Sequence, residues 1–155
     1  MKIKLITFSK DDDKHVRALF ELYAQRLKHY TSFEYLNFKP EKSADPASQK
    51  KKDADMLLKK MEDHAMLILL DEQGEEMNSI QLAGFISGKM NAAVRSLQFV
   101  IGGAYGFDKR VYHRCNGMIS LSKFTLPHQL AKVVMAEQLY RAFTIIRNEK
   151  YHHGE

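Results

Sequence analysis

Residues 97–106 read LQFVIGGAYG, a mostly apolar segment that runs directly into a glycine-rich one. The apolar part, Leu97–Ile101, predicts a strand buried within a sheet. The glycine-rich part, Gly102–Gly106, then lies at the carboxyl end of that strand, where open α/β sheets bind their ligands. The stretch therefore predicts an α/β domain with a candidate ligand loop at residues 102–106.

Outward from this stretch, predicted strands alternate with predicted helices. The further strands are Met1–Phe8, Phe33–Phe38, Ala65–Leu70 and Met118–Leu121. The helices are one that is capped by Asp11–Asp13 and reaches Tyr30, then Ala54–Asp63, Ser79–Met90, Lys109–Cys115 and Pro127–Arg147. Between them we expect a basic loop at Lys39–Asp53 and a turn at Asp71–Gly74. The alternation predicts an α/β fold with a mainly parallel sheet. The sequence shows no internal repeat and no long linker, so we expect residues 1–155 to form one domain.

Composition limits the compartment and the partners. No apolar run approaches the roughly 18 residues of a membrane span, so no membrane partner is expected. Cys115 is the single cysteine, which fits a reducing cytoplasm, where we expect this protein. The formal net charge of +5 favours a polyanionic partner, because phosphate neutralisation dominates nucleic-acid affinity.

The sequence lacks the motifs of several kinds of binding site. Gly102–Gly106 does not have the G-x-G-x-x-G spacing of the dinucleotide fingerprint. It is not a phosphate-binding P-loop either, because no Gly-Lys-Ser/Thr follows it. From the glycines alone, a tight turn with positive φ is the simpler interpretation. His113 and Cys115 have no partner pair at metal-ligand spacing, so no metal is expected. The residues favour binding through loop backbone over covalent catalysis.

The last predicted helix is apolar around nearly its whole circumference. Such a helix is normally covered on all sides, which predicts a homodimer through this helix. Burial within one subunit, under the N-terminal helices, is the alternative. One polar stripe, Glu137, Arg141, Thr144 and Asn148, interrupts the pattern. It is either an exposed ion pair between residues four apart or a charged groove at a subunit boundary.

Several ordered segments are similar to the RlmH family, pseudouridine methyltransferases of the large ribosomal subunit. They are FVIGGAYG (Phe99–Gly106), ISLSKFTLPHQLAKVV (Ile119–Val134), EQLYRAFTI (Glu137–Ile145) and YHH (Tyr151–His153). The N-terminal strand, LLDEQG (Leu69–Gly74) and NSIQLA (Asn78–Ala83) extend the resemblance over essentially the whole chain. The chain departs from the family at Asn78-Ser79, in the Lys39–Asp53 loop and at Tyr105.

The resemblance implies a fold, a reaction and a cofactor site. The fold is an α/β SPOUT fold with a C-terminal trefoil knot, which no sequence pattern here would predict. The reaction is methylation of N3 of a pseudouridine in 23S rRNA, on assembled ribosomes, by a homodimer that uses S-adenosyl-L-methionine. The cofactor contacts implied are Leu70, Gly102, Gly103, Leu121, Ser122, Lys123, Phe124, Thr125 and Leu126.

Three further residues are candidates for the catalytic step. Tyr151 and His152 would hold the target base or assist loss of its N3 proton, and Arg141 would position the RNA or the partner's tail. RNA phosphates would be contacted by Lys50, Lys51, Lys52, Arg110, Arg114 and Lys123. Two alternatives remain: a non-catalytic ribosome- or RNA-binding protein, and a SPOUT methyltransferase that acts on tRNA.

Overall fold

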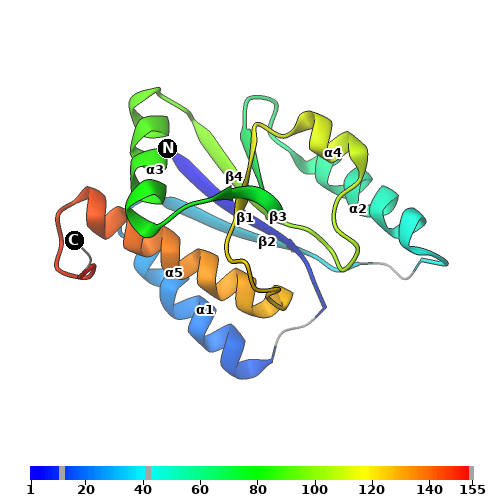
Figure 1. Cartoon of the computed structure of the whole chain (residues 1–155), viewed down its shortest axis with the longest axis horizontal. Helices are drawn as coiled ribbons and strands as arrows, with labels where there is room; N and C mark the ends of the chain where they lie inside the picture. The colour runs from blue at the N-terminus through cyan, green and yellow to red at the C-terminus, as the bar shows by residue number, and fades with distance from the viewer. Residues whose placement is uncertain (11–12, 41–42, 154–155) are drawn as a thin grey trace.

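The computed structural model describes residues 1–10, 13–40 and 43–153 (Figure 1). The strands are β1 (Lys2–Phe8), β2 (Ser32–Phe38), β3 (Met66–Glu76), β4 (Ser96–Ile101) and β5 (Gly117–Ser120). The helices are α1 (Lys14–Leu27), α2 (Pro46–Lys60), α3 (Ser79–Asn91), α4 (Lys109–Arg114) and α5 (His128–Ile146). Asp13 caps α1 through a bond from His15 N to its side chain, while Asp11 and Asp12, also predicted to cap it, lie outside the described residues.

The strands form one sheet in the order β2-β1-β4-β3-β5, and every neighbouring pair is parallel. This confirms the predicted α/β class. Buried residues of α1, α3 and α5 form a core on one face, and those of α2 and α4 form a second core on the other (Figure 1). The central strand β4 is buried along its whole length, as its apolar sequence predicts. The C-terminal knot stays a prediction.

Helix α2 begins earlier than predicted. Its first residue is Pro46, so the predicted start at Ala54 is wrong and much of the expected basic loop is helical. Asp45 caps the helix by accepting a hydrogen bond from Ser48 N (2.9 Å), and proline suits a first turn, where no backbone N–H is needed. The three lysines at positions 50–52 therefore project from a helix and not from a loop.

Strand β3 also differs from its prediction, because it continues beyond the expected turn at residues 71–74. Its pairing with β5 shifts from Leu70 opposite Ile119 to Glu75 opposite Ile119, so the intervening residues bulge out and the strand resumes. Gly74 permits this, since a Cβ there would lie 2.5 Å from Ile119 N. Asp71 accepts a hydrogen bond from Gln73 N within the bulge, a bond typical of turns.

Helix α5 packs against both α1 and α3 on one face of the sheet (Figure 1). Its residues Met135, Ala136, Leu139 and Ala142 are fully buried, so one subunit already covers much of its apolar surface. Burial under α1 thus explains part of the all-round pattern, and the homodimer stays a prediction. Within the described residues, no helix has the length and apolarity that a membrane span requires.

Candidate functional site

An open cavity of about 190 Å³ lies where β4 and β5 end and where β3 bulges after Leu70. The loops after β4 and β5 meet the bulge there, at an edge where open α/β sheets bind their ligands. The structure brings every residue of the expected cofactor set to this one cavity. They are Leu70 at β3, Gly102 and Gly103 after β4, and residues 121–126 after β5.

The glycine loop fits tightly between its neighbours. A Cβ at Gly102 would lie 3.1 Å from the Phe107 ring, and a Cβ at Gly103 would lie 2.6 Å from Asp53 Oδ2. Gly106 has a φ of +76°, and its N–H donates to Gly103 O (3.0 Å) to close the loop. The loop is therefore a tight turn that also packs closely against its neighbours. Because its glycines carry no side chains, the backbone itself borders the cavity.

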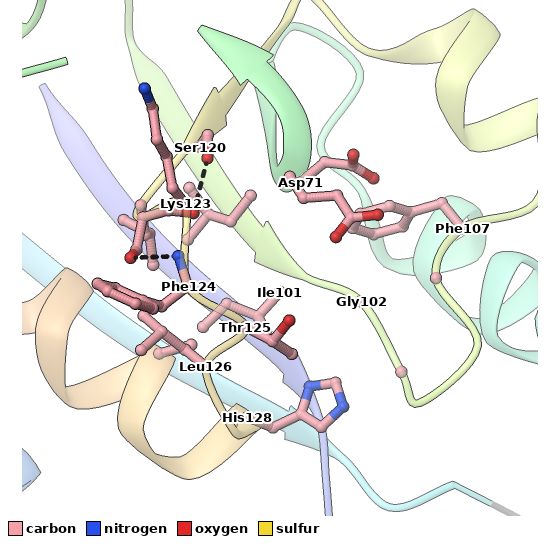
Figure 2. A pocket seen from close by; sticks show the side chains of 17 residues that line it. Asp71, Ile101, Gly102, Phe107, Ser120, Lys123, Phe124, Thr125, Leu126 and His128 are labelled. Carbon is pink, nitrogen blue, oxygen red and sulfur yellow. Dashed lines mark hydrogen bonds between the residues drawn. The ribbon is translucent and has the colours of Figure 1, made fainter. Parts of the chain in front are cut away.

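The segment after β5 is ordered by serine side chains (Figure 2). Ser120 Oγ donates to Ser122 O (3.2 Å), and Phe124 N donates to Ser122 Oγ (2.9 Å). Phe124 is 84% exposed, so the described residues leave this apolar side chain largely uncovered. Lys123 Nζ lies 3.7 Å from Glu76 Oε2, and both side chains are exposed, so this ion pair stabilises little.

Sequence reasoning missed other residues of the cavity wall. Asp71, Phe107 and His128 line it, and Figure 2 shows Asp71 and Phe107 on one side and residues 123–126 on the other. Tyr112 donates to Asp71 Oδ2 (2.7 Å), and burial, reinforced by this bond, raises the pKa of Tyr112 to about 12. The signal for Asp71 is its place directly after the apolar part of β3, although the sequence around it favours a surface turn.

The three catalytic candidates lie together at the other end of α5. The Arg141 guanidinium bonds to Glu137 and lies 4.7 Å from the centre of the Tyr151 ring. Tyr151 donates to Glu137 Oε1 (3.1 Å), and burial together with its hydrogen bonds raises the pKa of Tyr151, so it stays a donor at neutral pH. Arg141 Nη1 lies 3.4 Å from His152 Nδ1, which must accept because a guanidinium only donates.

This cluster is far from the candidate cofactor cavity of its own chain. His128 at the start of α5 lines the cavity, whereas Arg141 lies 13 residues further along the helix, or about 20 Å at a rise of about 1.5 Å per residue. Within the polar stripe, Glu137 and Arg141 form an ion pair between residues four apart, but their side chains are only 16% and 25% exposed, so the pair is not on an exposed face as one interpretation expected. Its Thr144 is buried and donates to Arg141 O (2.7 Å).

The basic candidates are brought together only in part. Helix α4 lies beside α2, and Arg110 donates to Asp55 Oδ1 (2.7 Å) and to Lys51 O (3.2 Å), which holds it beside the lysines at positions 50–52. Arg114 is at the opposite end of α4, where it donates to Ala65 O. Lys123 is on the cavity loop. In the part of the chain that is described, no group of three His, Cys, Asp or Glu residues could hold a metal ion.

The similarity to known proteins extends over the whole chain. The family model described as "Predicted SPOUT methyltransferase" matches residues 1–152. "Ribosomal RNA large subunit methyltransferase H" of Christiangramia forsetii is 42% identical over 156 residues, covering 99% of each chain. The protein of the same name in Cytophaga hutchinsonii is 43% identical over 155 residues, covering 99% of this chain and 100% of that one. A solved structure, "a probable methylase family protein" from Haemophilus influenzae, has a TM-score of 0.52 at 11% identity, covers 98% of this chain and 70% of that one, and supports the fold alone.

Proposed function

The chain belongs to the SPOUT methyltransferase family, and we propose that it methylates N3 of a pseudouridine in 23S rRNA, with S-adenosyl-L-methionine as the methyl donor. The observation that carries this proposal is the convergence of the whole expected cofactor set on one cavity at the carboxyl edge of the sheet. Relatives that match over their full length and carry the name of a large-subunit rRNA methyltransferase support the class of substrate.

The chemistry of the cavity suits this donor. S-adenosylmethionine carries no phosphate, and the chain has no P-loop to bind one. Leu70, Leu121 and Leu126 would line an apolar slot for the adenine. Gly102 and Gly103 carry no side chains, so the donor could approach their backbone closely. Asp71 adds a carboxylate to the cavity wall, which would attract the positively charged donor. When bound, the donor supplies an electrophilic methyl group on its sulfonium.

The protein's part in the reaction is orientation and proton handling. A methyl group passes directly to N3, so no nucleophile of the enzyme is needed, and alignment can contribute several kcal/mol. The N3 proton must leave along a path to an acceptor or to water. Tyr151, which remains protonated, would hold the target base by redirecting its single O–H from Glu137 to the base, and His152 would order the same region from beside Arg141.

A homodimer would bring this cluster to the cofactor. Because Arg141 lies about 20 Å along α5 from its own cavity and contacts Tyr151 and His152, antiparallel pairing of two α5 helices would place one subunit's cluster at the other's cavity. Leu19 and Leu22 on α1 and Leu130 on α5 are exposed leucines that such pairing would cover. His152 Nε2 is buried without a hydrogen-bond partner among the described residues, and a second subunit or the RNA would supply one.

The RNA is expected to follow α2 and α4. Lys50, Lys51 and Lys52 on α2 and Arg110 on α4 lie near one another and together make the basic surface, with Lys50 beside the glycine loop. Phosphate contacts of such residues would fix position without reading sequence. Arg114 and Lys123 would contact phosphates at its margins. A domain of this size offers little area for reading bases, so recognition would depend on the shape of the assembled ribosome in the cytoplasm.

Two measurements separate this function from its alternatives. Calorimetry with S-adenosylmethionine distinguishes an enzyme from a non-catalytic RNA-binding protein, and the absence of binding at millimolar cofactor would exclude the enzyme. Labelled methyl transfer to intact ribosomes, to free rRNA and to tRNA then identifies the substrate. We expect transfer to ribosomes, whereas transfer to tRNA alone would identify a different SPOUT activity.

A further inference from the structure

A second, larger cavity adjoins the cofactor cavity across the glycine loop. It has a volume of about 790 Å³ and is lined by the loops after β1, β2 and β4 and by the start of α5. Because β4 lies between β1 and β3, the loop after β4 separates the two cavities. Gly103 and His128 line both cavities, so the two cavities adjoin at these residues, and a molecule in the second would lie next to a cofactor in the first.

One wall of this second cavity carries a buried carboxylate. Asp53 on α2 is 7% exposed, and its Oδ1 accepts a hydrogen bond from Gln49 Nε2 (2.8 Å). Its Oδ2 lies against Gly103, at the border between the two cavities. Burial raises the pKa of Asp53, and the Gln49 bond opposes that shift. A polar N–H brought into the cavity would compensate the carboxylate for its lost hydration.

The glycine loop supplies an aromatic side chain to the same cavity. Tyr105 lines it and is 52% exposed, so its ring is open to a ligand. Nucleic-acid bases stack on exposed aromatic rings of this kind. The cavity thus combines an exposed ring, a side-chain amide and a buried carboxylate within reach of the cofactor cavity.

We propose that this second cavity receives the target base, extruded from the RNA, with the ring stacked on Tyr105 and its free N1–H donated to Asp53. The inference rests on the proposed function, because N3 of the base must face the cofactor. Pseudouridine carries two ring N–H groups, N1–H and N3–H, whereas uridine carries only N3–H. With N3 facing the cofactor, only pseudouridine has a second ring N–H that can donate to the Asp53 carboxylate. Gln49 holds the carboxylate and offers its amide to a neighbouring ring carbonyl.

The first test compares methyl transfer to ribosomes that carry pseudouridine with transfer to ribosomes that carry uridine at the same position. Asp53→Asn should reduce the preference for pseudouridine by about 10- to 100-fold, which is the range for a hydrogen bond to a charged group. Affinity for S-adenosylmethionine, measured by calorimetry, should stay within about twofold, and this also reports correct folding. The exposed Asp63→Asn is the matched control. An unchanged preference in Asp53→Asn would overturn the proposal.

The second test concerns the ring. Tyr105→Ala should raise KM for ribosomes by about tenfold or more, because stacking contributes roughly 1–3 kcal/mol per base. Tyr105→Phe keeps the ring and should behave like the unaltered protein. If Tyr105→Ala leaves KM unchanged, the ring does not stack on the base and the proposal fails.

A third readout does not depend on catalysis. NMR titration of the full chain with pseudouridine 5′-monophosphate should shift the amides of Gly103, Tyr105 and Asp53, and uridine 5′-monophosphate should shift them much less. Equal shifts with both nucleotides, or none with either, would overturn the pocket assignment even if the enzyme methylates ribosomes. Absence of methyl transfer together with the selective shifts would instead refute the proposed function and retain a pseudouridine-binding cavity.

Discussion

The carboxylate of Asp53 lies directly against the backbone of Gly103, so that a Cβ at position 103 would lie 2.6 Å from Asp53 Oδ2. This contact joins α2, on one face of the sheet, to the loop that follows the central strand β4. It fixes the position of the loop between the two cavities. The packing of a single glycine therefore couples the basic surface of α2 to the cofactor site.

Replacement of this glycine tests that coupling. Gly103→Ala forces either the carboxylate or the loop to move, and overpacking of this kind costs about 1–3 kcal/mol of stability. We expect weaker binding of S-adenosylmethionine by calorimetry and a lower midpoint of urea unfolding. The matched control is Gly84→Ala in α3, where a Cβ meets nothing within 4 Å. That variant should gain about 0.5–1 kcal/mol, and equal behaviour of the two variants would contradict the coupling.

A second prediction concerns acid stability. Glu62 accepts from Lys4 (3.0 Å) and Lys2 (3.1 Å), and these bonds, that of Lys4 foremost, lower the pKa of Glu62 from 4.5 to about 2. A carboxylate whose pKa is lower in the folded state stabilises the fold at any pH above its unfolded-state pKa. This stabilisation is lost as the pH falls through the folded-state pKa. The contribution should therefore be complete at pH 7 and disappear between about pH 5 and 2.

Urea unfolding of Glu62→Gln at several pH values checks this. Because the Glu62 side chain is 38% exposed, solvent screening reduces the effect, and we expect a loss of about 1 kcal/mol at pH 7 that vanishes near pH 2. Glu21→Gln, on the exposed side of α1, is the control and should change little. A loss that persists undiminished at pH 2 would show that the ion pair is not its cause.

The basic surface predicts a dependence on salt. Replacement of Lys50, Lys51 and Lys52 together by Gln removes three charges from α2. The slope of log affinity for ribosomes against log salt should fall by roughly 0.7–0.9 for each phosphate that the variant no longer neutralises. Lys89→Gln on α3, which packs on the other face of the sheet, is the control. An unchanged slope in the triple variant would place the RNA elsewhere.

The dimer predicts complementation between two impaired proteins. A chain truncated before Tyr151 should bind S-adenosylmethionine normally but transfer no methyl group, because its cavity is intact and its tail is missing. Coexpression with Gly103→Ala should restore about a quarter of the sites, since half of randomly paired dimers are mixed and each mixed dimer has one complete site. No recovery in purified mixed dimers would mean that each chain completes its own site.

The sequence pattern and the resemblance predict the α/β class, the family and the residues of the cofactor cavity, because these depend on periodicity and on ordered motifs. They place the start of α2 too late, since its polar composition outweighs the local signal of Asp45 followed by Pro46. They miss Asp71, Phe107 and His128 because only the folded topology brings the loops of these residues to one edge. The distance between Tyr151 and the cavity depends on the length and direction of α5, which a motif does not encode.

The central claim is tested most directly by nucleoside analysis of ribosomes incubated with the protein and S-adenosylmethionine. Mass spectrometry of the digested rRNA should find one added methyl group per large subunit, on N3 of a pseudouridine, and none in tRNA from the same extract. A methyl group on tRNA, on a ribose or on another base, or no methyl group at saturating cofactor, would contradict it.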